Sequence, residues 1–285
     1  MQPEISVIIP TSRRPASLRR ALDKILVCEP APAEVLVHVD AGDTETVPMI
    51  EREFADKATW FQSEITQGPG GGRNHLLQRA KYPIVASFDD DSWPFDKDYF
   101  ATASQLMWAN PQAGVLTGRV TSRGETPAEK TDALTQTASF EGGACVHRRE
   151  AFFSTSGFLP LRYAYGMEEV DVALQLLDKG WVILRTSSLR IFHDSELQHH
   201  ISPKINAKHI TNTALLAYLR YPIGYWPLGI LQIMNRILYS LKKRRFQGVL
   251  NGLLAIPFII GKYRRYRQPV KSDTLRRSRK LLKQK

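Results

Sequence analysis

The first part of the chain alternates short apolar runs with helical patterns. Between the first two runs, Arg14–Leu26 places its leucines and Ile25 on one helical face. A second helix is expected over Arg73–Ala80, after a glycine-rich loop at Gly68–Gly72. Strands that alternate with helices predict βαβ units and an α/β fold with a mainly parallel central sheet. The apolar runs typical of buried strands are Ile5–Pro10, Glu34–Val39, Trp60–Ile65 and Ile84–Phe88.

The pattern becomes mixed after residue 110. We expect strands over Gly114–Val120 and Ser139–His147, separated by a polar excursion at Thr121–Gln136. A helix is expected over Glu168–Leu177. One or two closing strands follow over Trp181–His193.

A different composition begins at Thr211. Residues 230–241 carry an apolar helical stripe, and the second apolar stretch, Gly248–Gly261, is only 14 residues long. A helix needs about 20 apolar residues to span a bilayer, so both segments suit a helix that lies in the interface. We therefore expect an α/β domain over residues 1–220 and an amphipathic, basic, membrane-associating extension over 221–285.

Positive charge is concentrated in that extension. The 285 residues carry 39 bases and 28 acids, for a net charge of +11. Residues 242–285 hold fifteen of the bases and one acid, Asp273, whereas residues 1–241 have a net charge of −3. Such asymmetry indicates an anionic partner for the tail, either a membrane surface or nucleic acid. The membrane is favoured, and nucleic acid is not expected, because the body has no net basic charge and the tail's aromatic residues are mixed with aliphatic runs.

Composition and the N-terminus limit the class of protein. Hydrophobic residues make up 43% and charged residues 24%, which fits neither disorder nor a polytopic membrane protein. Two cysteines, Cys28 and Cys145, supply no disulfide framework and no zinc motif. The first residues resemble no secretory signal, so a cytoplasmic location is expected.

Three consecutive aspartates follow the strand over Ile84–Phe88. Asp89, Asp90 and Asp91 repel one another unless a cation or base lies between them. The alternatives are a Mg²⁺ or Mn²⁺ site and an acidic turn that caps a helix near Asp98. We favour the metal, because ligands of α/β sheets bind at the carboxyl ends of the strands, where Asp40 also lies.

Two other groups of residues have both a functional and a structural interpretation. The Gly68–Gly72 loop matches no phosphate-binding template, and it is either an ordinary loop or a close approach to a phosphorylated ligand with Arg73 as the charge partner. The acids Glu168, Glu169 and Asp171 either stabilise a helix N-terminus or supply a general base. His193 becomes a candidate ligand only if it meets the aspartates in space.

Taken in order, these segments resemble the family 2 glycosyltransferases of the GT-A fold over residues 4–220. No single motif carries the resemblance. The segments that carry it are Ser6–Thr11 with Arg14-Pro15, Val39–Asp43, Gly72–Asn74, Phe88–Asp91 with Pro94, Glu141–Cys145, Arg148–Phe152 with Gly157-Phe158, Gly166–Asp171, and His193.

The resemblance implies inverting, metal-dependent transfer of a sugar from a nucleotide-diphosphate donor to an acceptor hydroxyl. It also implies a lipid-linked or saccharide acceptor, and a role in cell-surface polysaccharide or glycolipid synthesis on the inner face of the plasma membrane. By position, the resemblance implies that Glu169 is the catalytic base, with Glu168 beside it, and that Mn²⁺ or Mg²⁺ is held by Asp91, Asp89 and His193. The residues that it implies for substrate or nucleotide binding are Pro10, Thr11, Arg14, Asp40, Arg73, Asp89 and Asp90. On the acceptor side it implies Gly142, Gly143 and Asp171.

Two other functions compete with this interpretation. A nucleotidyltransferase would also need aspartates and a metal, but such enzymes usually carry a glycine-rich loop after the first strand, and Pro10–Arg14 contains no glycine. A catalytically inactive protein that only binds nucleotide sugars is the other alternative.

Overall fold

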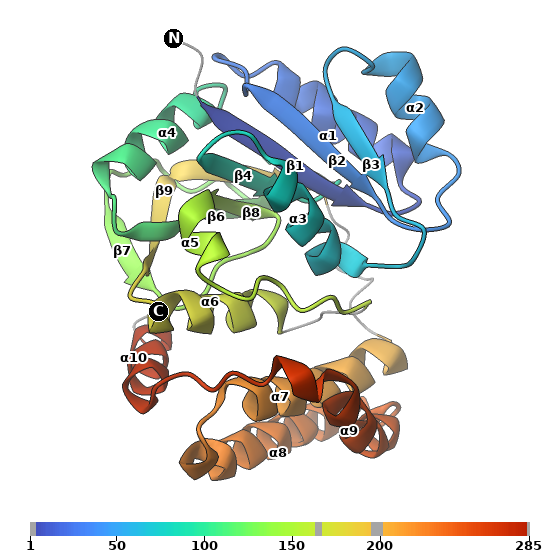
Figure 1. The fold of residues 1–285 in the computed structure, drawn as a ribbon, viewed down its shortest axis with the longest axis vertical. Coiled ribbons are helices and arrows are strands. Elements are labelled where there is room, and N and C mark those ends of the chain that lie inside the picture. Colours follow the sequence, from blue (N-terminus) through green and yellow to red (C-terminus); the bar gives the residue numbers. More distant parts are fainter. Residues whose placement is uncertain (1–3, 163–166, 195–201, 284–285) are drawn as a thin grey trace.

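The computed structural model describes residues 4–162, 167–194 and 202–283. In Figure 1 a sheet flanked by helices forms the upper part of the molecule, and helices from the last third of the chain form a layer below it. Gly166, part of one predicted motif, lies outside the described residues.

Nine strands among the described residues form one sheet, in the order β3-β2-β1-β4-β8-β6-β9-β5, with β7 paired to β9. Their bounds are β1 (Ile5–Thr11), β2 (Glu34–Val39), β3 (Thr59–Gln62), β4 (Ile84–Phe88), β5 (Ser92–Pro94), β6 (Ala113–Ser122), β7 (Leu134–Thr137), β8 (Ala144–Arg148) and β9 (Val182–His193).

The sheet is parallel in its first half and mixed in its second. Strand β1 pairs in parallel with β2 and β4, β2 pairs in parallel with β3, and β6 does so with β9. The pairs β4–β8, β6–β8, β5–β9 and β7–β9 are antiparallel. The expected parallel arrangement therefore holds for β1–β4. The later strands depart from it because they are not regularly joined by the long helical crossovers that parallel neighbours need.

Helices cover both faces of the sheet. One core cluster packs the sheet against α1, α2 and α4, and a second packs it against α3, α5 and α6. The helix bounds are α1 (Pro15–Leu26), α2 (Thr46–Glu53), α3 (Gly68–Arg79), α4 (Tyr99–Ala109), α5 (Arg149–Phe153), α6 (Glu168–Asp178), α7 (Pro203–Arg220), α8 (Trp226–Lys242), α9 (Val249–Tyr263) and α10 (Ser272–Leu282).

The glycine-rich segment is helical, which corrects the expectation of a loop at Gly68–Gly72. Asp40 accepts hydrogen bonds from the first backbone N–H groups of α3, at Gln67 (2.8 Å) and Gly68 (3.2 Å). The glycines permit close packing: a Cβ at Gly70 would lie 1.9 Å from Glu168 Oε1, and one at Gly72 would lie 2.7 Å from His38 Nδ1. Contact with the neighbouring elements therefore overrides the low helix propensity of glycine.

Helix α7 forms the centre of the lower layer, with α8 and α9 packed against it (Figure 1). A Cβ at Gly229 of α8 would lie 2.6 Å from the Cβ of Ala217, and one at Gly252 of α9 would lie 2.9 Å from the carbonyl oxygen of Ala207. The small residues let both helices approach α7 closely. Residue 220, the expected end of the catalytic domain, is thus the last residue of a helix that packs with the extension. Among the described helices, none is both long enough and apolar enough to cross a membrane.

Candidate active site

The carboxyl ends of β1, β2 and β4 meet at one edge of the sheet and line a cleft of about 880 Å³, hereafter the large cleft. Parallel pairing of β1 with β2 and β4 aligns these ends. The arrangement follows the rule that α/β sheets bind ligands where their strands end. Of the predicted residues, the large cleft brings together Pro10, Thr11, Arg14, Asp40, Asp89, Asp90, Asp91 and His193.

Asp89, Asp91 and His193 form a cluster with metal-ligand chemistry. One potential ligand atom from each lies within 4.8 Å of the others. Antiparallel pairing of Ser92 in β5 with His193 in β9 sets the imidazole beside the aspartates, and His193 Nε2 lies 3.1 Å from Asp91 Oδ1. Two carboxylates and one imidazole suit Mn²⁺ or Mg²⁺, so the residues present fit the expected ion.

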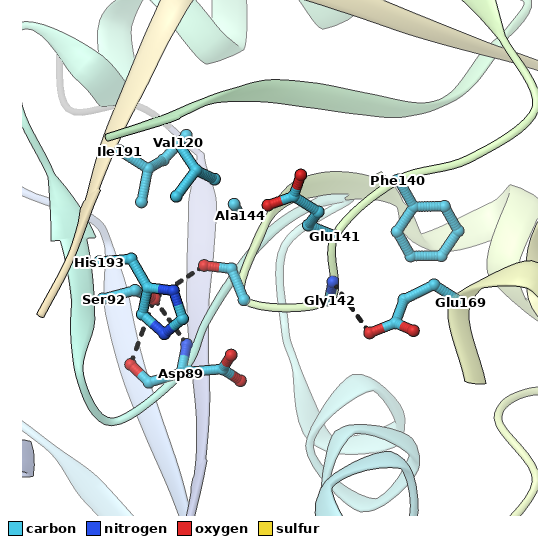
Figure 2. A pocket seen from close by; sticks show the side chains of 11 residues that line it. Asp89, Ser92, Val120, Phe140, Glu141, Gly142, Ala144, Glu169, Ile191 and His193 are labelled. Atoms are coloured by element: carbon cyan, nitrogen blue, oxygen red, sulfur yellow. Dashed lines mark hydrogen bonds between the residues drawn. The ribbon is translucent and has the colours of Figure 1, made fainter. Parts of the chain in front are cut away.

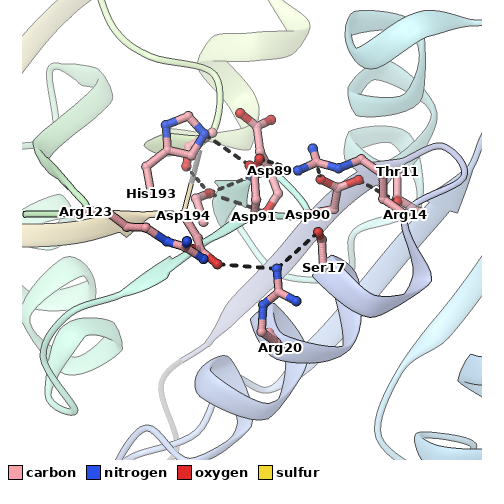
Figure 3. Close-up of polar contacts among 12 residues, drawn as sticks. Thr11, Arg14, Ser17, Arg20, Asp89, Asp90, Asp91, Arg123, His193 and Asp194 are labelled. Atoms are coloured by element: carbon pink, nitrogen blue, oxygen red, sulfur yellow. Dashed lines mark hydrogen bonds and ion pairs between the residues drawn. The ribbon is translucent and has the colours of Figure 1, made fainter. Parts of the chain in front are cut away.

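Arg14 joins the aspartates to the first helix (Figure 3). Its guanidinium lies 2.6 Å from Asp90 Oδ1 and 2.6 Å from Asp91 Oδ2, and the Thr11 hydroxyl donates to Asp90 at 2.7 Å. Burial raises the pKa of Asp90 to about 7 although Arg14 opposes it. Burial also favours protonation of Asp91, but hydrogen bonds from His193 and Arg14 outweigh it and hold that pKa at about 2. Asp91 is therefore an anion at neutral pH, as a metal ligand must be.

A small pocket of about 220 Å³ adjoins the large cleft (Figure 2). Asp89 and His193 line both. The small pocket also contains Glu169, Gly142 and Gly143, so one predicted catalytic acid and two predicted acceptor-side residues lie together. The backbone N–H of Gly142 donates to Glu169 Oε1 at 3.3 Å.

The two adjacent glutamates at the start of α6 have different surroundings. Glu169 faces the small pocket, and burial raises its pKa although Arg73 opposes it. Glu168 is 3% exposed, and its Oε1 has no hydrogen-bond partner among the described residues. Burial raises the pKa of Glu168 to about 8, so its carboxyl group is largely protonated at pH 7. Of the pair, Glu169 is the better placed to accept a proton.

Arg73 lies beneath the site, away from the nucleotide-binding position expected for it. Its side chain is 2% exposed and forms an ion pair with Asp89. Its Nε also donates to Ser87 Oγ at 3.1 Å, and Ser87 in turn donates to the Gly142 carbonyl at 2.6 Å. Arg73 therefore orients Asp89 and the Gly142 loop from within the protein.

Asp171 lies outside both the large cleft and the small pocket, whereas an acceptor-side position was expected. It is fully buried and forms an ion pair with Arg220 of α7. Residues 169 and 171 differ in direction because two steps along a helix rotate a side chain by about 200°.

The sequence interpretation missed several residues of the site. Ser92 donates to the Gly143 carbonyl at 2.7 Å and accepts from the Asp89 N–H at 2.8 Å, so it joins the metal cluster to the small pocket. Arg20, Arg123 and Arg162 line the large cleft. Arg20 and Arg123 pair with Asp194 (Figure 3). These arginines carry no motif, and only the fold brings them to one cleft.

Comparison with known proteins identifies a relative by sequence and several structures with the same fold. A curated relative, the GalNAc(5)-diNAcBac-PP-undecaprenol beta-1,3-glucosyltransferase of Campylobacter jejuni, is 32% identical over 92 residues. That match covers 31% of this chain and only 30% of the relative's length.

Solved structures share the fold. The mannosyltransferase PcManGT from Pyrobaculum calidifontis, in complex with GDP-Man and Mn²⁺, has a TM-score of 0.61 at 18% identity, covering 94% of this chain and 83% of that one. GalNAc-T7 with UDP, GalNAc and Mn²⁺ has a TM-score of 0.62 at 14% identity, covering 78% of this chain and 49% of that one. The α/β architecture of this chain is therefore that of GT-A glycosyltransferases.

A family model described as glycosyl transferase family 2 matches residues 6–165 of the 285. The matched range is more than half of the chain. It includes the strands of the large cleft, the three aspartates and Arg73. The chain therefore belongs to glycosyl transferase family 2.

Proposed function

We propose that this protein transfers a sugar from a nucleotide-diphosphate donor to an acceptor hydroxyl, with inversion at the anomeric carbon. The observation that carries the proposal is the junction of the large cleft and the small pocket at Asp89 and His193. A donor in the large cleft would bring its diphosphate to this junction, and an acceptor in the small pocket would lie beside Glu169. The two substrates would thus meet between the metal cluster and a carboxylate.

Charged residues of the large cleft suit a nucleotide diphosphate. Arg13, Arg14 and Arg162 line it together with the aspartates. Guanidinium groups bind phosphate oxygens with paired, charge-assisted hydrogen bonds. Asp91, Asp89 and His193 would hold Mn²⁺ or Mg²⁺, which when bound stabilises the charge that develops on the leaving diphosphate.

Glu169 would accept the proton of the attacking acceptor hydroxyl. Burial raises its pKa, which makes its carboxylate a stronger base than that of an exposed glutamate. The N–H of Gly142 orients the carboxylate, and Arg73 beneath it supplies a compensating charge. Direct displacement from the side opposite the leaving group accounts for inversion.

The exposed faces of α8 and α9 support attachment to a membrane surface. Ile230, Met234 and Leu238 of α8 are 53–59% exposed and lie one turn apart, as do Leu250, Leu254 and Phe258 of α9, at 62–81%. Apolar faces of this kind, flanked by the basic segments 242–245 and 262–267, suit an anionic bilayer.

We infer from this surface that the enzyme works at the inner face of the plasma membrane on a lipid-linked or saccharide acceptor. Synthesis of cell-surface polysaccharide or glycolipid is the pathway this placement fits. The name of the Campylobacter jejuni relative, which includes an undecaprenol-linked substrate, is in keeping with the proposal.

A thermal-shift screen of nucleotide diphosphates and nucleotide sugars, with and without Mn²⁺, tests the donor part of the proposal. A ligand at one hundred times its Kd stabilises the folded state by about 2.7 kcal/mol, which is measurable. We expect a shift with one nucleobase that depends on Mn²⁺. A folded sample with no shift for any nucleotide would overturn the transferase proposal in favour of an inactive relative.

Replacement of Asp91 by alanine should abolish the manganese-dependent part of that shift. The substitution removes an anionic ligand and leaves Arg14 and His193 without a shared partner. Titration of the nucleotide with and without Mn²⁺ provides the measurement, and Asp194→Ala is a control in the same cleft whose manganese dependence should persist. Unchanged manganese dependence in Asp91→Ala would exclude Asp91 from the metal site.

Replacement of Phe258 by glutamate should reduce binding to anionic liposomes at least about tenfold, since the change removes a large apolar side chain from the interface and adds a negative charge. Phe258 is 81% exposed on α9. The matched control is Trp108→Glu on α4, which is 56% exposed on the α/β body and should leave binding unchanged. Equal behaviour of the two variants in a flotation assay would argue against the α8–α9 surface.

A further inference from the structure

A separate pocket, of about 470 Å³, lies in the helical layer, where the first turn of α7 meets the end of α8 and the turn that leads to α9. We call it the basic pocket. Its lining includes one histidine, His209, and three arginines, Arg236, Arg244 and Arg245. None of the described residues that line it is acidic. The basic pocket therefore gathers positive charge without a neighbouring carboxylate in its lining.

Buried hydrogen bonds fix the position of these arginines. Asn206 of α7 is 8% exposed, and its side-chain amide donates to the carbonyls of Arg245 at 2.9 Å and Gln247 at 3.1 Å. Ser240 of α8 donates to the Asn206 side-chain oxygen at 2.7 Å. One buried asparagine thus joins α7, α8 and the following turn, so the pocket wall is a built part of the fold.

The buried portion of Arg236 has unused hydrogen-bonding capacity. Its Nε is inaccessible to solvent and has no hydrogen-bond partner among the described residues. Burial lowers the pKa of Arg236, and the nearby charge of Arg245 lowers it further although Tyr239 opposes the change. The N-terminal turn of α7, which carries the positive end of the helix dipole, lines the same pocket. An oxyanion with several acceptor atoms matches the positive charge that Arg236, Arg244 and Arg245 bring to the lining of the pocket.

The position of the basic pocket indicates where its ligand comes from. Tyr239 and Phe246 line it and are 45% and 60% exposed, and Leu238 of the α8 apolar face lies next to Tyr239 in the chain. The pocket therefore has exposed aromatic side chains on the helix that carries this apolar face and just beyond its end. Aromatic side chains beside arginines are suited to the headgroup level of a bilayer.

We propose that the basic pocket binds the phosphate group of an anionic lipid headgroup while the apolar faces of α8 and α9 lie on the membrane. The proposal rests on the membrane attachment inferred above. It adds a specific site, with Arg236, Arg244 and Arg245 as ligands, to a general attraction between basic residues and an anionic surface.

A matched pair of double variants tests the site on the full-length chain. R244Q/R245Q removes two charges that line the basic pocket, and K242Q/K243Q removes two charges from the adjacent exposed positions. Binding to phosphatidylglycerol-containing vesicles is compared with binding to pure phosphatidylcholine vesicles. We expect R244Q/R245Q to lose about tenfold more affinity for the anionic vesicles than K242Q/K243Q, because it removes paired hydrogen bonds as well as charge. R236Q, a single change, should show the same preference.

The other outcomes are distinguishable. Equal losses in the two double variants would overturn the site and leave only general electrostatic attraction. Failure of the parent protein to bind either vesicle would overturn membrane attachment itself. An increase in Tm with micromolar inorganic phosphate that R244Q/R245Q lacks, combined with equal vesicle binding, would identify a site for free phosphate. Unchanged nucleotide-dependent Tm shifts in the variants would show that they remain folded.

Discussion

The Glu169→Gln variant is expected to transfer sugar roughly 10²- to 10⁴-fold more slowly than the parent enzyme, the usual contribution of a general base. Glutamine keeps the shape of the side chain and can retain the contact with the Gly142 N–H, but it cannot take the proton of the acceptor hydroxyl. Since Glu169 lines the small pocket and lies outside the lining of the large cleft, nucleotide and manganese binding should persist. Steady-state transfer rates together with nucleotide titrations measure the two effects separately.

Glu168→Gln is the matched control, one residue away on the same helix. Glu168 faces Gly70 in the interior, and with a pKa of about 8 it is already mostly protonated at pH 7, so glutamine resembles its resting state. We expect transfer close to that of the parent protein. Loss of transfer in Glu168→Gln with near-normal rates in Glu169→Gln would exchange the assigned roles.

The pH dependence of transfer should agree with the same assignment. Catalysis needs the Glu169 carboxylate, and burial raises its pKa above the ordinary value of 4.5. The rate should therefore fall as the pH drops through this raised pKa, at a higher pH than an exposed glutamate would give. A rate profile with an acidic limb at or below 4.5 would contradict proton transfer to Glu169 in these surroundings.

Arg220→Met is expected to destabilise the fold by about 3–5 kcal/mol, the usual cost of leaving one member of a buried ion pair without its partner. Arg220 and Asp171 are 1% and 0% exposed. Arg220 also donates to Ser156 Oγ at 3.3 Å and to the Gln268 carbonyl at 3.3 Å, so one side chain joins α7 to α6 and to the segment before α10. Thermal unfolding should show a decrease in Tm on the order of 10 °C.

Two further variants show whether this loss comes from the unpaired carboxylate. Asp171→Leu combined with Arg220→Met removes both charges, and should recover much of the stability because no buried charge is left unpaired. Arg276→Ala breaks the exposed pair with Asp273 and should leave the Tm unchanged within error. A double variant as unstable as Arg220→Met would attribute the loss to packing.

Local patterns were sufficient to predict the strands of the parallel half of the sheet and most of the chemistry at their ends, but they missed β5 and β7 and began β8 five residues too early, at Ser139. The strands over Glu34–Val39 and Ile84–Phe88 have the predicted bounds, because a short run rich in β-branched and other apolar residues is typical of a strand that is buried on both faces. Asp40 and Asp89–Asp91 could be assigned to one cleft, since parallel strands end at the same edge. The expectation of an Asp89, Asp91 and His193 cluster, which came from the family resemblance, matches an arrangement present in the structure.

Where packing between distant segments decides the conformation, local patterns were insufficient. The sequence predicted a loop at Gly68–Gly72. The segment is helical because the backbone N–H groups at its start donate to Asp40 and because its glycines pack closely against Glu168 and His38. The family resemblance implied that Arg73 binds the nucleotide. In the structure its guanidinium pairs with Asp89 and donates to the buried Ser87, so the side chain lies inside the protein.

The sequence by itself determined the α/β architecture, the edge of the sheet that carries the site, and the basic, amphipathic character of the C-terminal helices. These properties depend on residue type and on the strand and helix periods of two and about 3.6 residues, so a short stretch of sequence is enough to detect them. Only the tertiary structure showed that Glu169 faces a pocket while Glu168 is buried, paired Asp171 with Arg220, and gathered Arg236, Arg244 and Arg245 around one pocket. Those outcomes depend on which side chain is buried and on which distant segment lies opposite, so burial and long-range contact decide what each charged group can do.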